Sequence, residues 1–215
     1  MATETGLRER KKQQTRQLLT DTARQLFGAR GFENVSVSEI ARVADVSEAT
    51  VFNYFPTKED LVYSGLEQFE SALLAAVRER PAGETVIDAF GRFILEPRGF
   101  LAAPDDRTAR ELLAVGRMIA ASPALLAREE QIFARYTDAL ARLIADEVRA
   151  PEGDIRPYVV ANALIGVHRA LIDYVRERLD SQPPDRERLW RGLSQRGRAA
   201  LELLRRGVGE YATKR

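Results

Sequence analysis

Residue types that carry out chemistry are scarce in this sequence. Its 215 residues include no cysteine and one histidine, His168. The lack of cysteine excludes disulfides, thiolate nucleophiles and cysteine-based zinc sites, and one histidine cannot form a multi-histidine metal site. The segment 84–211 also lacks the usual phosphate-binding, dinucleotide-binding, metalloprotease and serine-hydrolase motifs. We therefore expect no enzyme, no catalytic residue, no metal and no cofactor.

Overall charge gives no argument for a nucleic-acid partner. Lys and Arg number 33 against 32 Asp and Glu, which leaves a formal charge of +1, while 45% of the residues are hydrophobic. The composition is that of a folded protein, and any claim on DNA must come from local patterning. The polar N-terminus has no apolar signal segment and no stretch is long enough to span a bilayer, so we expect a soluble, cytoplasmic protein.

The spacing of apolar residues is helical almost throughout. They recur every three or four residues, and no stretch shows the alternation of a strand. The pattern predicts an all-α protein of about nine helices, over 8–30, 36–43, 47–54, 57–80, 84–102, 105–121, 124–149, 155–181 and 185–211. Short helices over the first part and long helices after it predict a small domain of three helices over 1–56, followed by a helical-bundle domain over 57–215 in which 57–80 is the connector helix.

Three helix starts lie close together in the first domain. Ser36 and Glu39 have the spacing of a capping box, Ser47 repeats the cap, and Thr57 provides a third. The turn between the second and third helices is short enough to impose the large crossing angle of a helix-turn-helix. Asp45 occupies the turn position where glycine is common, and Asp tolerates a left-handed backbone better than most residues.

The third helix is predicted to bury one face and expose the other. The buried face comprises Ile40, Ala41, Ala44, Val46, Val51 and Phe55, closed by Leu18, Ala23, Leu26 and Phe27 of the first helix. The outward residues are Glu48, Ala49, Phe52 and Asn53, with Thr50 and Tyr54 at the edges. A helix of this size fits a DNA major groove. The alternative roles are core packing for Phe52 and a favourable first-turn charge for Glu48.

Three runs of this region, 26–32, 37–41 and 46–61, resemble the DNA-binding head of the TetR family. The resemblance implies a homodimeric transcription factor, usually a repressor that a small ligand releases from a palindromic double-stranded DNA operator. It implies base contacts for Ser38, Glu48, Ala49, Phe52 and Asn53, and phosphate contacts for Ser36, Thr50, Tyr54 and Lys58. A basic run ahead of the first helix is a further candidate for DNA contact, although it is also typical of a solvated helix start; it comprises Arg8, Arg10, Lys11, Lys12 and Arg16.

For the second domain the resemblance implies a dimer interface through the last two helices, 155–181 and 185–211. We expect two apolar stripes to form it: Ala161, Leu164, Ile165, His168, Leu171, Ile172 and Val175, and Leu189, Leu193, Ala200, Leu203 and Leu204. Effector binding would swing the connector helix and so change the separation of the two reading helices.

A ligand pocket is expected between the helices of the second domain. Its candidate wall is Phe93, Phe100, Met118, Phe133 and Tyr136, with Arg117, Asn162 and His168 to orient a ligand. Ordinary core packing is the more common role for His168 and for such aromatics, and Arg117 either serves an anionic ligand or extends to solvent. A loose resemblance of this domain to mycofactocin-system regulators implies an apolar or amphipathic, acyl-thioester or lipid-like ligand.

Other functions fit the same residues. A ligand-independent regulator or an activator would have a similar sequence, and a helical small-molecule-binding enzyme with a vestigial head is a less favoured alternative. A dimerisation scaffold is the simplest alternative, but the outward polar and aromatic residues of 47–54 argue against it.

Overall fold

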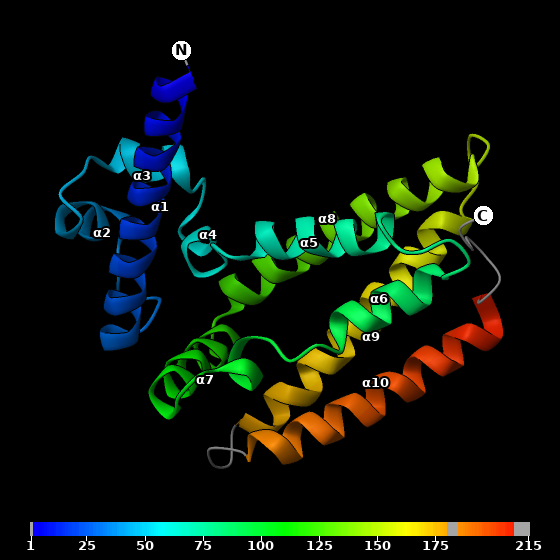
Figure 1. Ribbon diagram of the computed structural model, residues 1–215. Helices are drawn as coiled ribbons and strands as arrows, with labels where there is room; N and C mark the ends of the chain where they lie inside the picture. Colours follow the sequence, from blue (N-terminus) through cyan, green and yellow to red (C-terminus); the bar gives the residue numbers. More distant parts are fainter. Residues whose placement is uncertain (1, 180–184, 209–215) are drawn as a thin grey trace. The chain divides into compact units, whose positions relative to one another are not determined.

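The described part of the molecule is helical. The computed structural model describes residues 2–179 and 185–208, and within those ranges it contains ten α-helices, one short 3-10 helix (η1) and no strand (Figure 1). The all-α prediction is therefore confirmed. The expected ends of the last two helices, 180–181 and 209–211, lie outside the described residues. No described helix is both long and apolar enough to cross a membrane.

The chain forms two compact units. The first comprises Met1–Leu66 together with Met118–Leu126, and the second comprises Glu67–Arg117 and Ala127–Arg215. The first unit therefore includes a short piece of chain that follows more than fifty residues of the second unit in sequence.

The first unit contains α1 (Ala2–Arg30), α2 (Val37–Val43), α3 (Glu48–Tyr54) and α4 (Lys58–Val62). The three expected caps are present: Ser36 Oγ accepts from the Glu39 amide at 3.2 Å, Ser47 Oγ accepts from the Thr50 amide at 3.1 Å, and Thr57 forms a full capping box with Asp60. The expected return contact from the Glu39 carboxylate to the Ser36 amide is wrong, because that carboxylate pairs with Arg30 and Arg42.

The turn between α2 and α3 has the predicted backbone. Asp45 has a φ of 55°, the left-handed conformation that the sequence required there. The core beneath the turn contains Ile40, Ala41, Ala44, Val51 and Phe55, as expected. One α1 contact was assigned one residue too early: Leu18 is 48% exposed, and the fully buried Leu19 takes its place. Consecutive side chains point about 100° apart around a helix, so only one of the two faces the core.

The second unit contains α5 (Leu66–Arg78), α6 (Val86–Ile94), η1 (Gly99–Ala102), most of α7 (Asp106–Ala121) and α8 (Pro123–Val148), α9 (Arg156–Leu179) and α10 (Arg186–Val208). α10 packs along both α9 and α6 (Figure 1). The core of this unit is aliphatic and aromatic, with Leu73, Phe90, Leu140, Ile144 and Leu164 among its fully buried side chains.

Two predicted helices are interrupted. The connector expected over 57–80 is wrong as a single helix: α4 ends at Val62, residues 63–65 form a turn, and α5 begins at Leu66. Gly65 weakens a helix at this point, and Tyr63 makes a tertiary hydrogen bond, described below. The helix expected over 84–102 ends at Ile94 and resumes only as η1, because Pro97 has no amide hydrogen to donate and disfavours helical backbone in Glu96.

The basic run does not precede the first helix. α1 begins at Ala2, so Arg8, Arg10, Lys11 and Lys12 lie within it on exposed positions. Arg16 is turned inward: it donates to the Tyr54 carbonyl at 3.2 Å, and its guanidinium lies 4.6 Å from the centre of the Phe55 ring. An extended basic arm is therefore the wrong description for these five residues.

Six residues of the two expected dimer stripes belong to the core of the protomer instead. Ala161, Leu164, Ile165 and Leu171 of α9 are buried within the protomer, and so are Leu189 and Leu193 of α10. These faces cover the core of the second unit, since α9 and α10 pack on each other and on α6. Only Leu203 of the expected set is a strongly exposed apolar side chain.

Candidate functional site

The outward face of α3 exposes both polar and apolar side chains. Glu48, Ala49 and Asn53 are exposed, and the Phe52 side chain is 47% exposed although it is a large hydrophobic residue. Val51 and Phe55 fix the opposite face in the core at 1% exposure each. The helix therefore presents its outer residues on a rigid support, and core packing does not account for Phe52.

Hydroxyl groups border this face on both sides. Ser36 Oγ lies 2.8 Å from Ser38 Oγ at the start of α2, and Ser47 Oγ lies 2.8 Å from Thr50 Oγ1 at the start of α3. Each pair combines a helix cap with a second hydroxyl. Free amides and hydroxyls at helix starts suit the oxygens of an anion such as a phosphate.

Lys58 holds the loop between α1 and α2 in place. Its ammonium donates to the carbonyls of Phe32 and Val35, at 3.0 and 3.2 Å, and lies 4.0 Å from the centre of the Phe32 ring. An ammonium has three N–H donors, so these two bonds leave one for a phosphate oxygen. This structural role of Lys58 was not anticipated from the sequence.

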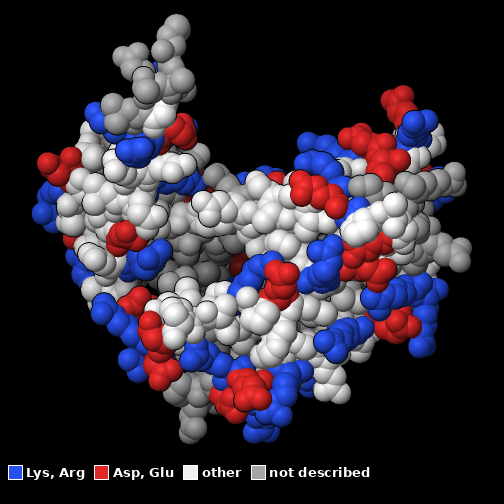
Figure 2. All heavy atoms as spheres, viewed as in Figure 1, with Lys and Arg blue, Asp and Glu red and all other residues white. Residues whose placement is uncertain are grey.

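Charges of opposite sign are interspersed on the visible face of the second unit rather than gathered by sign (Figure 2).

In the first unit, the hydrogen bond from Arg30 lowers the pKa of Glu39, with further help from the charge of Arg42. Glu39 therefore stays ionised beside the Ser36 cap, where an acidic group near a helix start is favourable.

An aromatic cluster occupies the interior of the second unit. Phe69 of α5 lies 5.2 Å from Phe93 of α6, 5.9 Å from Tyr136 of α8 and 5.2 Å from His168 of α9, measured between ring centres. Phe133 of α8 meets both Tyr136 and His168 edge to face. Four helices thus contribute one ring or more to a single apolar site.

His168 is the polar group within this cluster. Its Nδ1 is buried without a hydrogen-bond partner among the described residues. Burial, assisted by the positive charge of Arg98, lowers the pKa of His168 to about 4. The ring is therefore neutral at pH 7. A buried polar atom without a partner is uncommon and marks a position that a water or a ligand can satisfy.

The structure brings together four of the eight predicted pocket residues: Phe93, Phe133, Tyr136 and His168. Arg117 is exposed on α7, Asn162 is exposed on α9, and Met118 is half-buried in the first unit, so none of these three lines the cluster. Phe100 falls in η1, and its side chain lies outside the described part of the structure.

Sequence reasoning missed two members of the cluster. Phe69 was overlooked because its segment was interpreted only as a connector. Arg98 was overlooked because its segment was assigned to a continuous helix; its guanidinium lies 3.9 Å from the centre of the Phe93 ring.

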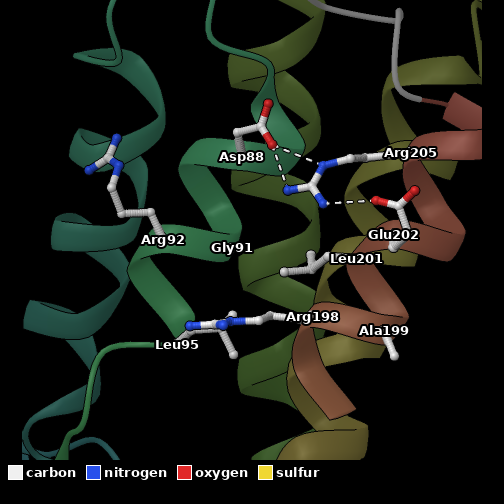
Figure 3. Close-up of a pocket in the computed structure, with 9 residues that line it drawn as sticks. All are labelled: Asp88, Gly91, Arg92, Leu95, Arg198, Ala199, Leu201, Glu202 and Arg205. Carbon is white, nitrogen blue, oxygen red and sulfur yellow. Dashed lines mark hydrogen bonds and ion pairs between the residues drawn. The ribbon is translucent and has the colours of Figure 1, made fainter. Parts of the chain in front are cut away.

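A separate groove of about 690 Å³ lies between α6 and α10 (Figure 3). Arg205 spans it, donating to Asp88 at 2.7 Å and to Glu202 at 3.2 Å. Burial alone would raise the pKa of Asp88, but hydrogen bonds from Thr85 and Arg205 outweigh burial and lower it. A Cβ on Gly91 would lie 2.6 Å from Leu201 Cδ1, so the glycine allows the two helices to approach closely. The paired charges join α6 to α10.

An exposed apolar face remains on the outer side of α9 and α10. Ile155 and Leu203 are each 71% exposed, while Tyr158 and Val159 are each 51% exposed. The two helices run antiparallel, so the start of α9 lies beside the end of α10 (Figure 1). Asn162, Gly166 and Ala170 continue this face along α9. Large apolar side chains that stay exposed in this way make the face a candidate interaction surface.

Comparison with known proteins gives consistent results. A family model described as "Bacterial regulatory proteins, tetR family" matches residues 19–63. The regulator TcmR of Streptomyces glaucescens is 32% identical over 177 residues, which cover 77% of this chain and 75% of TcmR. The "Putative mycofactocin biosynthesis transcriptional regulator MftR" of Mycobacterium tuberculosis is 26% identical, over 74% of this chain and 78% of its own. A solved TetR-family regulator from Pectobacterium atrosepticum aligns with a TM-score of 0.46 at 20% identity, covering 94% of this chain and 97% of that chain.

Proposed function

This chain belongs to the TetR family of transcriptional regulators, and from that premise we propose that it is a homodimeric repressor which a small molecule releases from a palindromic DNA operator. The observation that carries the proposal is the outward face of α3. Phe52 and Asn53 stand exposed on a short helix that is capped by Ser47 and anchored by Val51 and Phe55. A short, rigid helix with adaptable outer residues is suited to reading base edges in a major groove.

The proposed DNA contacts divide into two groups. Ser38, Glu48, Ala49, Phe52 and Asn53 meet base edges: the Asn53 amide can pair with adenine, the Phe52 ring can pack on a thymine methyl, and Glu48 can accept from a cytosine amino group. Ser36, Thr50, Tyr54 and the remaining N–H of Lys58 bind phosphates and fix the register.

We assign the dimer interface to α9 and α10, but through their outer face. Ile155, Tyr158, Val159 and Leu203 supply its apolar centre, and Gly166 and Ala170 allow close approach of the partner helix. Twofold symmetry then presents two copies of α3, which must reach major grooves roughly 34–36 Å apart.

The aromatic cluster is the proposed effector site. Phe69, Phe93, Phe133 and Tyr136 provide apolar walls, and neutral His168 provides a hydrogen-bonding group in their midst. Largely apolar sites with a few placed polar groups are typical of ligand pockets, and this one suits an apolar or amphipathic molecule. The resemblance to MftR is consistent with such a ligand.

The test is selection of duplexes from a random library by the purified protein, followed by titration of the selected duplex. The Asn53→Ala variant should prefer a different set of duplexes. Its discrimination between the preferred base pair and other base pairs should fall by roughly 1–3 kcal/mol at one position of each half-site. Tyr54→Phe should weaken binding to all sequences alike. Gln25→Ala, an exposed amide of α1, is the control and should change neither property. Failure to enrich any sequence would refute the proposal.

A further inference from the structure

The corner between α7 and α8 belongs to the first unit. Residues 118–126 form the end of α7 and the first residues of α8, and they group with α1 to α4. The rest of both helices lies in the second unit. Both α7 and α8 therefore continue from the first unit into the second without a break in the helix.

Two side-chain hydrogen bonds hold the corner to residues 1–66 of the first unit, which are called the head below. Ser122 Oγ donates to Glu33 Oε1 at 2.6 Å, and the Tyr63 hydroxyl donates to the Leu125 carbonyl at 2.9 Å. Ser122, Tyr63 and Leu125 are 3%, 8% and 0% exposed. The bond from Tyr63 is therefore buried, whereas the bond from Ser122 is only partly shielded from water because Glu33 is exposed. A hydroxyl that donates to a carboxylate makes one of the stronger kinds of hydrogen bond.

The two bonds grip the head at separate points. Glu33 lies in the turn between α1 and α2, the same turn whose carbonyls bind Lys58. Tyr63 directly follows α4. Ser122 also accepts from the Leu125 amide at 3.4 Å, which places it at the cap position in front of Pro123, a favourable first residue of a helix. A movement of the first turn of α8 would therefore pull on the turn that leads into α2.

α8 also reaches the proposed effector site without a break. It runs from Pro123 to Val148 and carries Phe133 and Tyr136 of the aromatic cluster. At 1.5 Å per residue, Phe133 lies roughly 12 Å along the helix from Leu125. In contrast, the path from α4 to α5 beyond Tyr63 passes through the turn residues Ser64 and Gly65, where backbone rotation can absorb a displacement.

The geometry points to Ser122, Glu33 and Tyr63 as positioning residues that couple the aromatic cluster to the reading helix through α8. This inference rests on the proposed function, because it assigns the route between the effector site and the DNA-binding surface. Binding at the cluster displaces Phe133 and Tyr136, α8 carries the displacement to its first turn, and the two hydrogen bonds transfer it to the head. By reciprocity, DNA binding at the head alters α8.

The reciprocal effect can be tested without knowing the effector. Hydrogen–deuterium exchange is measured for the full chain with and without the duplex obtained by selection. In the wild type, the duplex should protect peptides of α2 and α3, and should also change exchange in α8 peptides beyond residue 127. In the double variant Ser122→Ala/Tyr63→Phe, the protection of α2 and α3 should remain, while the duplex-induced change in α8 should be lost.

Two control variants distinguish a loss of the coupling through α8 from a general loosening of the fold. Ser194→Ala/Tyr174→Phe removes one hydroxyl of each kind from α10 and α9, away from the corner, and should leave the α8 response intact. Ser64→Gly loosens the turn between α4 and α5 and should also leave it intact. A persistent α8 response in the corner variant, or its loss in the Ser64→Gly variant alone, would overturn the inference and favour the α4–α5 path. A wild type that binds duplex with no change in α8 would overturn it too, whereas absence of any DNA binding would refute the proposed function itself.

Discussion

Replacement of Leu203 by alanine should dissociate the proposed dimer. Leu203 is 71% exposed in the protomer and lies near the C-terminal end of α10. The substitution removes three carbon atoms from each protomer. At about 0.8 kcal/mol per buried CH₂ group, and counting only the exposed share, each copy of Leu203 contributes about 1.7 kcal/mol to association. Because a twofold interface contains the residue twice, the loss is about 3 kcal/mol, or roughly two orders of magnitude in the dimer dissociation constant.

Sedimentation equilibrium over a concentration series measures this change directly. Leu18→Ala is the matched control, since Leu18 is also an exposed leucine, at 48%, but lies on α1. It should leave the dissociation constant within about threefold of the wild type, a change of less than 1 kcal/mol. An unchanged dimer in the Leu203→Ala variant, or an equal effect from Leu18→Ala, would refute the assignment of the interface to this face.

Three further predictions concern the second unit and α3. The pKa of His168 is about 4 in the folded protein against an ordinary 6.5, so between these values the unfolded chain binds a proton that the folded protein does not. The free energy of unfolding should therefore fall by about 3 kcal/mol as pH drops from 6.5 to 4, and this loss should be absent from the His168→Gln variant. The single histidine NMR signal should titrate near pH 4. Arg80→Met should lower the free energy of unfolding in urea by about 3–5 kcal/mol, because the fully buried guanidinium donates to Glu147 at 2.8 Å and to the Val77 carbonyl at 2.7 Å. Arg92→Met breaks an exposed pair with Glu84 and should lower it by about 1 kcal/mol or less. Equal effects of the two substitutions would contradict the buried role of Arg80. Phe52→Ala should leave the thermal unfolding of the first unit almost unchanged, since 47% of the side chain is already exposed, yet weaken binding to the selected duplex; a large loss of stability instead would make Phe52 a core residue.

The head could be predicted in detail because its signals are local. Caps at Ser36, Ser47 and Thr57 act over three residues, and the left-handed Asp45 follows from the length of one turn. Burial of α2 and α3 follows from their spacing. The register of α1 was harder, because Leu18 and Leu19 are adjacent apolar residues and only packing decides between them.

The second unit could be predicted only as a set of helices. α9 has apolar residues on most of its surface, so periodicity alone does not say which face covers the core and which face remains exposed. The strongest stripe, with Leu164 and Leu171, is the one that the protomer buries. Phe69, Arg98 and the contact between Ser122 and Glu33 depend on segments that are far apart in sequence, and no local spacing reveals them.

The central claim is that α3 reads DNA as one of a symmetric pair. Hydroxyl-radical footprinting of the selected duplex tests it most directly. The account predicts two protected segments whose centres lie about 34–36 Å apart, one helical turn of DNA, and predicts that Leu203→Ala weakens both together. A single asymmetric protected segment, or uniform reactivity along the whole duplex at low ionic strength, would contradict it.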